Sequence, residues 1–76
     1  MEIKEFIEQF AGQFYDTELS EFKPETVFHD LDEYTSLIAL SIILMIDEEY
    51  CVSIDASEMA AAVTIEDLFN TVKAKL

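Results

Sequence analysis

The stretch EYTSLIALSIILMIDEEY, Glu33–Tyr50, decides the fold of this chain. Every residue from Leu37 to Ile46 is apolar except Ser41, and three acids and a tyrosine follow directly. The whole chain holds one Gly and one Pro, which favours helices with few tight turns. Thr35 is of a type preferred at helix N-caps. The stretch therefore predicts a helix over residues 36–50.

This predicted helix has two apolar faces when it is drawn at about 100° per residue. One face holds Ala39, Ile42, Ile43, Ile46 and Tyr50. The nearly opposite face, which we name the leucine face, holds Leu37, Leu40 and Leu44, with Ser41 and Glu48 beside them. We expect the first face to pack into the core. The leucine face is then either covered by another segment, as in a helix buried all round, or exposed for docking, which is what exposed apolar patches often mark.

The segment before this helix predicts one further helix and a long loop. Its apolar residues recur at helical spacing over residues 2–15: Ile3, Phe6, Ile7, Phe10 and Phe14. Residues 16–34 show no clean period and are expected to form a long ordered loop. Four side chains are predicted to pin that loop to the core: Leu19, Phe22, Phe28 and Leu31.

The segment after it predicts an extended link, a short helix beginning near Asp55 or Ser57, and a last helix. Thr64 is placed to cap the last helix, with Asp67 in a position resembling a capping box. Its apolar stripe is Ile65, Leu68, Phe69 and Val72. Residues 1–76 are thus expected to form one all-α domain, a small four-helix bundle with three longer helices, one short helix and a long loop between the first two.

Composition narrows the class of function. Acids outnumber bases 17 to 4, for a formal net charge of −13. This charge disfavours binding to nucleic acid or to an anionic membrane and favours partners with basic surfaces. The apolar run is about half the length that spans a bilayer. No secretory signal is visible and the lone Cys51 fits a reducing compartment, so we expect a cytoplasmic protein. We also expect it to be a monomer.

Ser36 is the candidate functional residue. The N-terminus of a helix presents unpaired N–H groups and partial positive charge, which favour a phosphate. A serine there, followed by an apolar docking face, is suited to carry a phosphodiester. The alternative is that Ser36 only caps the helix, as Ser and Thr at helix starts commonly do.

The residues around Ser36 resemble the acyl carrier protein family. TSLIALSIILMIDEEY (35–50) looks like that family's second helix, whose signature is Asp-Ser-Leu followed by an apolar helix, a run of acids and an aromatic residue. VSIDASEMAAAVTIEDLF (52–69) resembles the family's link, short third helix and Thr-capped fourth helix. The resemblance covers most of the chain and is strongest from 28 to 69.

The resemblance implies a function for the predicted helix. Ser36 would carry 4′-phosphopantetheine, donated from coenzyme A by a phosphopantetheinyl transferase. The thiol of this arm would hold acyl intermediates as thioesters for fatty acid biosynthesis or for a dedicated lipid or polyketide-type pathway. The protein would be no enzyme itself but would serve acyl-loading and synthase enzymes. The residues expected to meet these partners are Leu37, Leu40, Leu44, Asp47 and Glu48.

The sequence also departs from the family pattern. Thr35 replaces the signature Asp, and Ile38 and Ser41 stand where members often have acids. Basic partners are therefore expected to bind Asp47–Glu49 and the acids before Ser36, namely Asp30, Asp32 and Glu33. This favours a dedicated pathway over the general fatty acid synthase.

Two alternative functions remain open: a carrier for aminoacyl or other non-fatty groups, and an unmodified acidic helical adaptor for a basic partner. Asp30 and Asp32 do not fit a calcium-binding loop, which would need Gly and Glu at the positions of Thr35 and Ser41. His29 is expected to be structural, and Cys51 to be a small, partly buried residue. Tyr34 is expected to pack over the long loop, the alternative being that it touches the arm.

Overall fold

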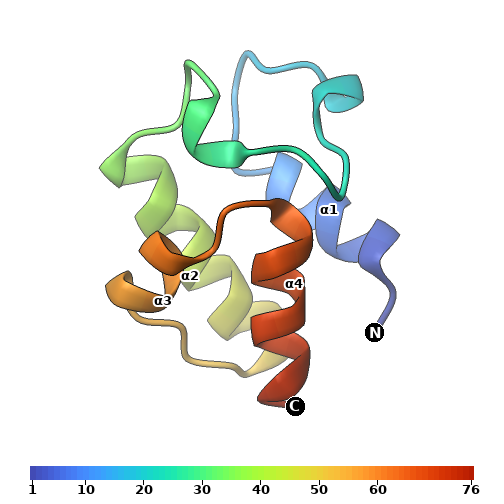
Figure 1. The fold of residues 1–76 in the computed structure, drawn as a ribbon, viewed down its shortest axis with the longest axis vertical. Coiled ribbons are helices and arrows are strands. Elements are labelled where there is room, and N and C mark those ends of the chain that lie inside the picture. The colour runs from blue at the N-terminus through green and yellow to red at the C-terminus, as the bar shows by residue number, and fades with distance from the viewer.

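A computed structural model describes all residues, 1–76, and shows four α-helices and two single-turn 3₁₀ helices. In chain order these are α1 (Ile3–Ala11), η1 (Leu19–Glu21), η2 (Phe28–Asp30), α2 (Ser36–Tyr50), α3 (Ala56–Ala61) and α4 (Ile65–Ala74). The predicted small all-α bundle is confirmed. Figure 1 shows the segment between α1 and α2 crossing one end of the bundle, with the C-terminus at the other.

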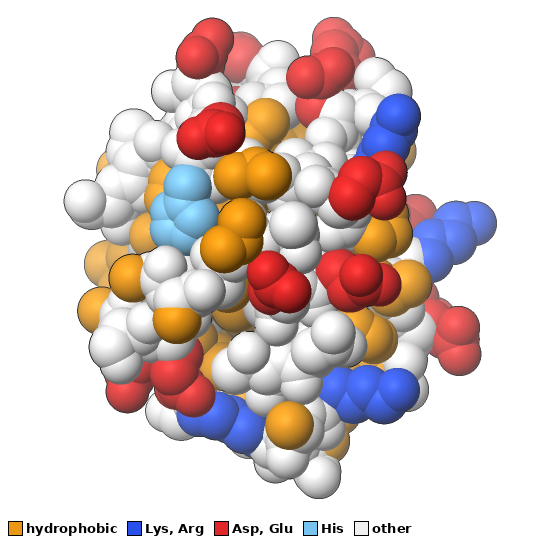
Figure 2. Space-filling model, in the orientation of Figure 1, with side chains coloured by type: hydrophobic (Ala, Val, Ile, Leu, Met, Phe, Trp, Pro, Cys, Tyr) orange, Lys and Arg blue, Asp and Glu red, His pale blue; other side chains and the backbone are white.

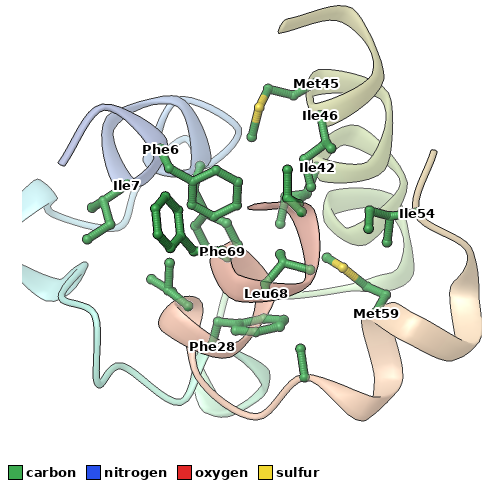
Figure 3. Close-up of a cluster of buried hydrophobic side chains, with 14 of the residues drawn as sticks. Phe6, Ile7, Phe28, Ile42, Met45, Ile46, Ile54, Met59, Leu68 and Phe69 are labelled. Atoms are coloured by element: carbon green, nitrogen blue, oxygen red, sulfur yellow. The ribbon is translucent and has the colours of Figure 1, made fainter. Parts of the chain in front are cut away.

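The core holds 18 buried side chains, none of them polar or charged. All four helices contribute to it, and Figure 3 shows side chains from α1, α2, α3 and α4 converging between the helices. Phe10 links α1 to the loop, because its ring centroid lies 5.4 Å from that of Phe28 and 6.0 Å from that of Phe22, both edge-on. Such edge-on pairs stabilise beyond the area they bury.

The first helix is shorter than predicted, because α1 ends at Ala11 instead of near residue 15. Gly12, a weak helix former, stands at its C-cap. The chain continues beyond it in a tighter turn, in which Phe14 N–H donates to the Ala11 carbonyl at 3.0 Å. Phe14 therefore remains buried on the α1 stripe although the α-helix has ended.

The long loop is ordered by hydrogen bonds to the start of α4 as well as by buried rings. The carbonyls of Pro24 and Thr26 accept from the N–H groups of Glu66 and Ile65, at 2.9 and 3.1 Å. These two donors lie in the first turn of α4, where no partner exists within the helix. Phe22 and Phe28 are buried as predicted.

The prediction for Leu19 is wrong. Its side chain is 60% exposed on η1 and does not pin the loop to the core. Phe22, three residues later, takes the buried position beside Phe10 and Phe14 instead.

The boundaries of α2 are as predicted, but its buried face is turned toward α1. Ile42 and Ile46 are fully buried, as expected, but Ile38 and Met45 are buried with them. The other residues assigned to the core face, Ala39, Ile43 and Tyr50, are only partly buried. The cause is the packing of α1 on the Met45 side, while Ala39 and Ile43 border an open cavity on the α3 side.

Candidate functional site

Thr35, not Ser36, caps α2. Thr35 has extended backbone angles, and its hydroxyl accepts a hydrogen bond from the Ile38 N–H at 3.2 Å. Its carbonyl accepts from the Ala39 N–H at 2.9 Å. Ser36 follows as the first helical residue, and it is exposed. The interpretation of Ser36 as only a cap is therefore wrong, and its hydroxyl is accessible to a modifying enzyme.

The first turn of α2 also lacks a charge that would repel a phosphate. It contains no acid, although α1, α3 and α4 each carry at least one acid in their first turns. The N–H groups of Ser36 and Leu37 lie ahead of the first intrahelical bonds and have no partner within the helix. A phosphodiester on Ser36 would meet these donors and the positive end of the helix dipole.

Ser36 borders an apolar cavity of about 340 Å³ between α2, α3 and the η2 segment. Seven of the nine lining residues are hydrophobic, and the full set is His29, Tyr34, Ser36, Ala39, Leu40, Ile43, Ala56, Met59 and Ala60. In Figure 2 the histidine side chain lies at the surface beside hydrophobic side chains. The cavity offers a place for an apolar group attached through Ser36.

Sequence reasoning missed the contribution of α3 to this cavity. Ala56 and Ala60 lie one turn apart on α3, and their short side chains leave the space between α3 and α2 unfilled. The signal was present in the alanine-rich stretch ASEMAAA, residues 56–62. This stretch predicted a short helix, but it did not show which residues of that helix would line a cavity.

His29 and Tyr34 make structural contacts and also form one wall of the cavity. The Tyr34 ring lies edge-on to Phe28 and His29, with centroid distances of 5.4 and 5.0 Å. Burial raises the pKa of the Tyr34 hydroxyl above its ordinary value of 10.0. His29 Nε2 lies 2.9 Å from the Ala62 carbonyl oxygen, and because a carbonyl only accepts, Nε2 carries the donated proton.

The side chains expected to meet partners are all exposed. Leu37, Leu40 and Leu44 are 71%, 51% and 52% exposed, so the leucine face is not covered by the loop. Asp47 and Glu48 are exposed beside it. A groove of about 240 Å³ continues from Leu44 to α1 and is lined by Gln9, Gln13, Ser41, Leu44, Met45, Glu48 and Glu49. The face therefore joins apolar area to negative charge.

Glu33 does not lie free for partners, which corrects the expectation for this residue. Its carboxylate accepts hydrogen bonds from the N–H groups of Tyr15, Asp16 and Thr17 at 2.7 to 3.0 Å, and from the Thr17 hydroxyl at 2.7 Å. Burial by itself would raise the pKa of Glu33, but these hydrogen bonds outweigh it and hold the pKa below its ordinary value. Glu33 anchors the chain that leaves α1, while Asp30 and Asp32 remain exposed.

Cys51 is exposed, and the prediction of a partly buried residue is wrong. It follows α2 in the left-handed conformation, with φ 55° and ψ 37°. Its N–H donates to the Asp47 carbonyl at 2.9 Å, so Cys51 closes the last turn of the helix. In this conformation the chain turns toward Val52, which is buried.

No protein-family model matches this chain, and no curated protein is significantly similar to it in sequence. None of its helices has the length and apolar character needed to cross a membrane. The structure thus defines a small helical bundle with an exposed serine at the start of α2 and an apolar cavity next to that serine.

Proposed function

We propose that this protein is a carrier of the acyl carrier type, with 4′-phosphopantetheine attached to Ser36. The observation that supports this proposal best is made at the start of α2. There Thr35 caps the helix, which leaves Ser36 exposed beside an apolar cavity. When bound, the arm supplies a thiol that holds acyl groups as thioesters. The residues around the site fit such a group in charge and in position.

The cavity supports an acyl rather than a polar cargo. It is lined mainly by aliphatic side chains of α2 and α3, with no charged carboxylate or lysine among them. Each methylene moved from water into such a site is worth about 0.8 kcal/mol. Even a few carbons of an attached chain would therefore favour the cavity over water. An aminoacyl group, which carries a charged amine, gains less there.

The leucine face and its acids support partners with basic, partly apolar surfaces. Leu37, Leu40 and Leu44 would supply the buried centre of such an interface, while Asp47 and Glu48 would steer the encounter. These partners are the transferase that modifies Ser36 and the cytoplasmic acyl-loading and synthase enzymes of a fatty acid, lipid or polyketide-type pathway. The protein itself serves these enzymes and performs no catalysis.

Modification of Ser36 is tested by incubating the protein with coenzyme A and a transferase of broad specificity. We expect one phosphopantetheine per chain by intact mass, and none on Ser36→Ala, whose helical circular dichroism should match that of the wild type. Ser41→Ala, a serine on the same helix, is the matched control and should be modified normally. Attachment at Ser41 or Thr35, or no attachment at all, would contradict the proposal.

The exposed leucine face also fits the second candidate, an unmodified adaptor for a basic protein. An adaptor would resist modification yet still bind its partner through this face. If the protein is modified on Ser36, it is a carrier, and the group found on the arm in cells, acyl or aminoacyl, distinguishes the two kinds of carrier.

A further inference from the structure

Helix α3 is the weakest element of the bundle, and it is tied at both ends by side chains from elsewhere in the chain. It has six residues, of which only Met59 is buried. Helices this short are marginal without outside support. A capping box between Asp55 and Glu58 orders its first turn, but this box lies within α3 and does not hold the helix against its neighbours.

Lys75 ties the beginning of α3 to the end of α4. Its Nζ lies 2.7 Å from Glu58 Oε2 and donates a hydrogen bond to the Ser53 carbonyl at 3.0 Å. This is the only salt bridge in a chain with 17 acids. The Lys75 side chain thus holds both α3 and the link that leads into it.

His29 ties the other end. Its Nε2–H donates to the carbonyl of Ala62, the C-cap residue directly after α3, across 33 positions of sequence. Stacking on Phe28, at a centroid distance of 4.3 Å, holds the imidazole in place. Lys75 and His29 therefore act from opposite ends of α3.

Between the two ties, α3 forms one wall of the cavity beside Ser36, through Ala56, Met59 and Ala60. The opposite wall is α2, which is anchored by four buried side chains. Of the two walls, α3 is held by one buried side chain and α2 by four, so the separation of the walls depends on what holds α3. Segments with few buried contacts open at the lowest free energy.

We propose that Lys75 and His29 are positioning residues that clamp α3 as a hinged wall, and so set how long an acyl chain the cavity accepts. The link to acyl length rests on the proposed carrier function, whereas the clamp itself does not. The Lys75 tie is an ion pair plus one hydrogen bond, and the His29 tie is one part-buried hydrogen bond. Each therefore changes the local opening of α3 by only about two- to tenfold. With both ties in place α3 stays closed against the cavity, and without both it opens frequently.

The clamp is tested on the unmodified protein by amide hydrogen exchange. Lys75→Met removes the ion pair, and His29→Phe removes the donor while keeping an aromatic ring on Phe28. Exchange at the Met59 and Ala62 amides, which bond within α3, should accelerate about two- to tenfold in each variant and more in the double variant. Exchange at the Leu68 amide of α4 should not change.

Lys73→Met is the matched control, since it makes the same change of charge in the same part of α4. Lys73 lies over the Phe69 ring at 6.0 Å, away from the ties to α3. It should leave α3 exchange unchanged. Unaltered exchange at Met59 and Ala62 in the double variant, or an equal acceleration at Leu68, overturns the clamp.

The effect on acyl length is tested with arms of increasing acyl length, loaded on Ser36 by a broad transferase from acyl coenzyme A. Cleavage of the thioester by hydroxylamine, which forms the acyl hydroxamate and frees the thiol of the arm, should slow with chain length until the cavity is full. In the double variant this limit should move to longer chains. An unmoved limit overturns the role in acyl length. Failure to load any arm refutes the carrier function instead, and the exchange experiment then decides the clamp alone.

Discussion

At the scale of single residues, the structure gives individual side chains tasks that their types do not reveal. Glu33 joins the segment before α2 to the chain leaving α1 through the backbone of Tyr15–Thr17. A carboxylate is acceptor-only and matches this cluster of donors, whereas an amide would direct its own N–H groups at some of them. Cys51 occupies the left-handed position after α2, which glycine fills most readily.

Glu33→Gln should lower the free energy of unfolding at pH 7. The pKa of Glu33 is lowered in the folded chain, so its contribution is present above the ordinary value of 4.5 and is lost as pH falls through the lowered pKa. The gap between variant and wild type in urea unfolding should therefore shrink below pH 4.5. Asp32→Asn, an exposed neighbour, is the control and should be nearly neutral. An equal effect of the two substitutions would contradict the anchoring role.

Cys51→Gly should stabilise the protein. The left-handed conformation costs a residue with a β-carbon about 1 to 2 kcal/mol, and glycine avoids this cost while losing about 0.5 to 1 kcal/mol of chain entropy. The thiol is exposed, so little packing is lost. We expect the free energy of unfolding, measured by thermal unfolding under reducing conditions, to rise by a few tenths to about 1 kcal/mol. Cys51→Ala, which keeps the β-carbon, should show no gain.

At the scale of elements, α2 is a helix with two apolar faces in different environments. One face fills the core, while the leucine face on the other side stays in water. The helix is apolar nearly all round, and what separates the faces is which side α1 and α4 cover. Its two faces should therefore respond differently to the same kind of truncation.

Ile46→Ala should cost about 2 to 5 kcal/mol, because Ile46 is fully buried. A small domain has roughly 5 kcal/mol or somewhat more in total, so this variant should be largely unfolded or molten. Leu44→Ala, with 52% of the leucine exposed, should cost much less. Under the proposed carrier function, it should instead slow modification of Ser36 or loading of the thiol by a cognate enzyme. Similar losses in chemical denaturation would show that the leucine face is part of the core.

At the scale of the whole molecule, charge opposes compactness. The chain folds 17 acids and 4 bases into a body of 29 × 24 × 20 Å with one salt bridge. At 0.01 M salt the screening length of about 30 Å exceeds these dimensions, so every charge acts on every other. At physiological salt it falls to about 8 Å, and most of the repulsion is screened.

The melting temperature should therefore rise with salt at neutral pH and rise again on mild acidification. Ordinary carboxyls protonate near pH 4, so lowering the pH toward 5 begins to relieve repulsion. Below that, stability should fall, because the pKa values of Glu33, Asp55, Glu58 and Asp67 are lowered by hydrogen bonds and, for Glu58, by Lys75. Such contributions hold above the ordinary values of 3.8 to 4.5 and are lost as pH falls through the lowered ones. A melting temperature indifferent to salt would contradict this account.

Features that depend on neighbours in sequence were predictable from the sequence. The boundaries of α2, the caps at Thr35 and Thr64 and the capping box with Asp67 all involve partners within a few residues. Helical periodicity also predicted that the leucine face lies opposite the core face, but the structure decided that it is exposed and not covered by another segment. Ser36, the central residue of the candidate site, was found from its place at the predicted start of the helix and from the family resemblance of the residues that follow it.

Only the tertiary structure decided the features that join distant segments. Glu33 meets Thr17 across 16 positions, Lys75 meets Ser53 across 22, and His29 meets Ala62 across 33. No periodicity relates such pairs, and each forms only after the core has set the helices against one another. The turn of the buried face of α2 toward α1, the exposure of Leu19 and the cavity beneath α3 have the same origin. Local hydrogen bonds and helical periodicity depend only on residues close together in the sequence. Packing depends on which surfaces of distant segments come into contact, and the sequence alone does not show that.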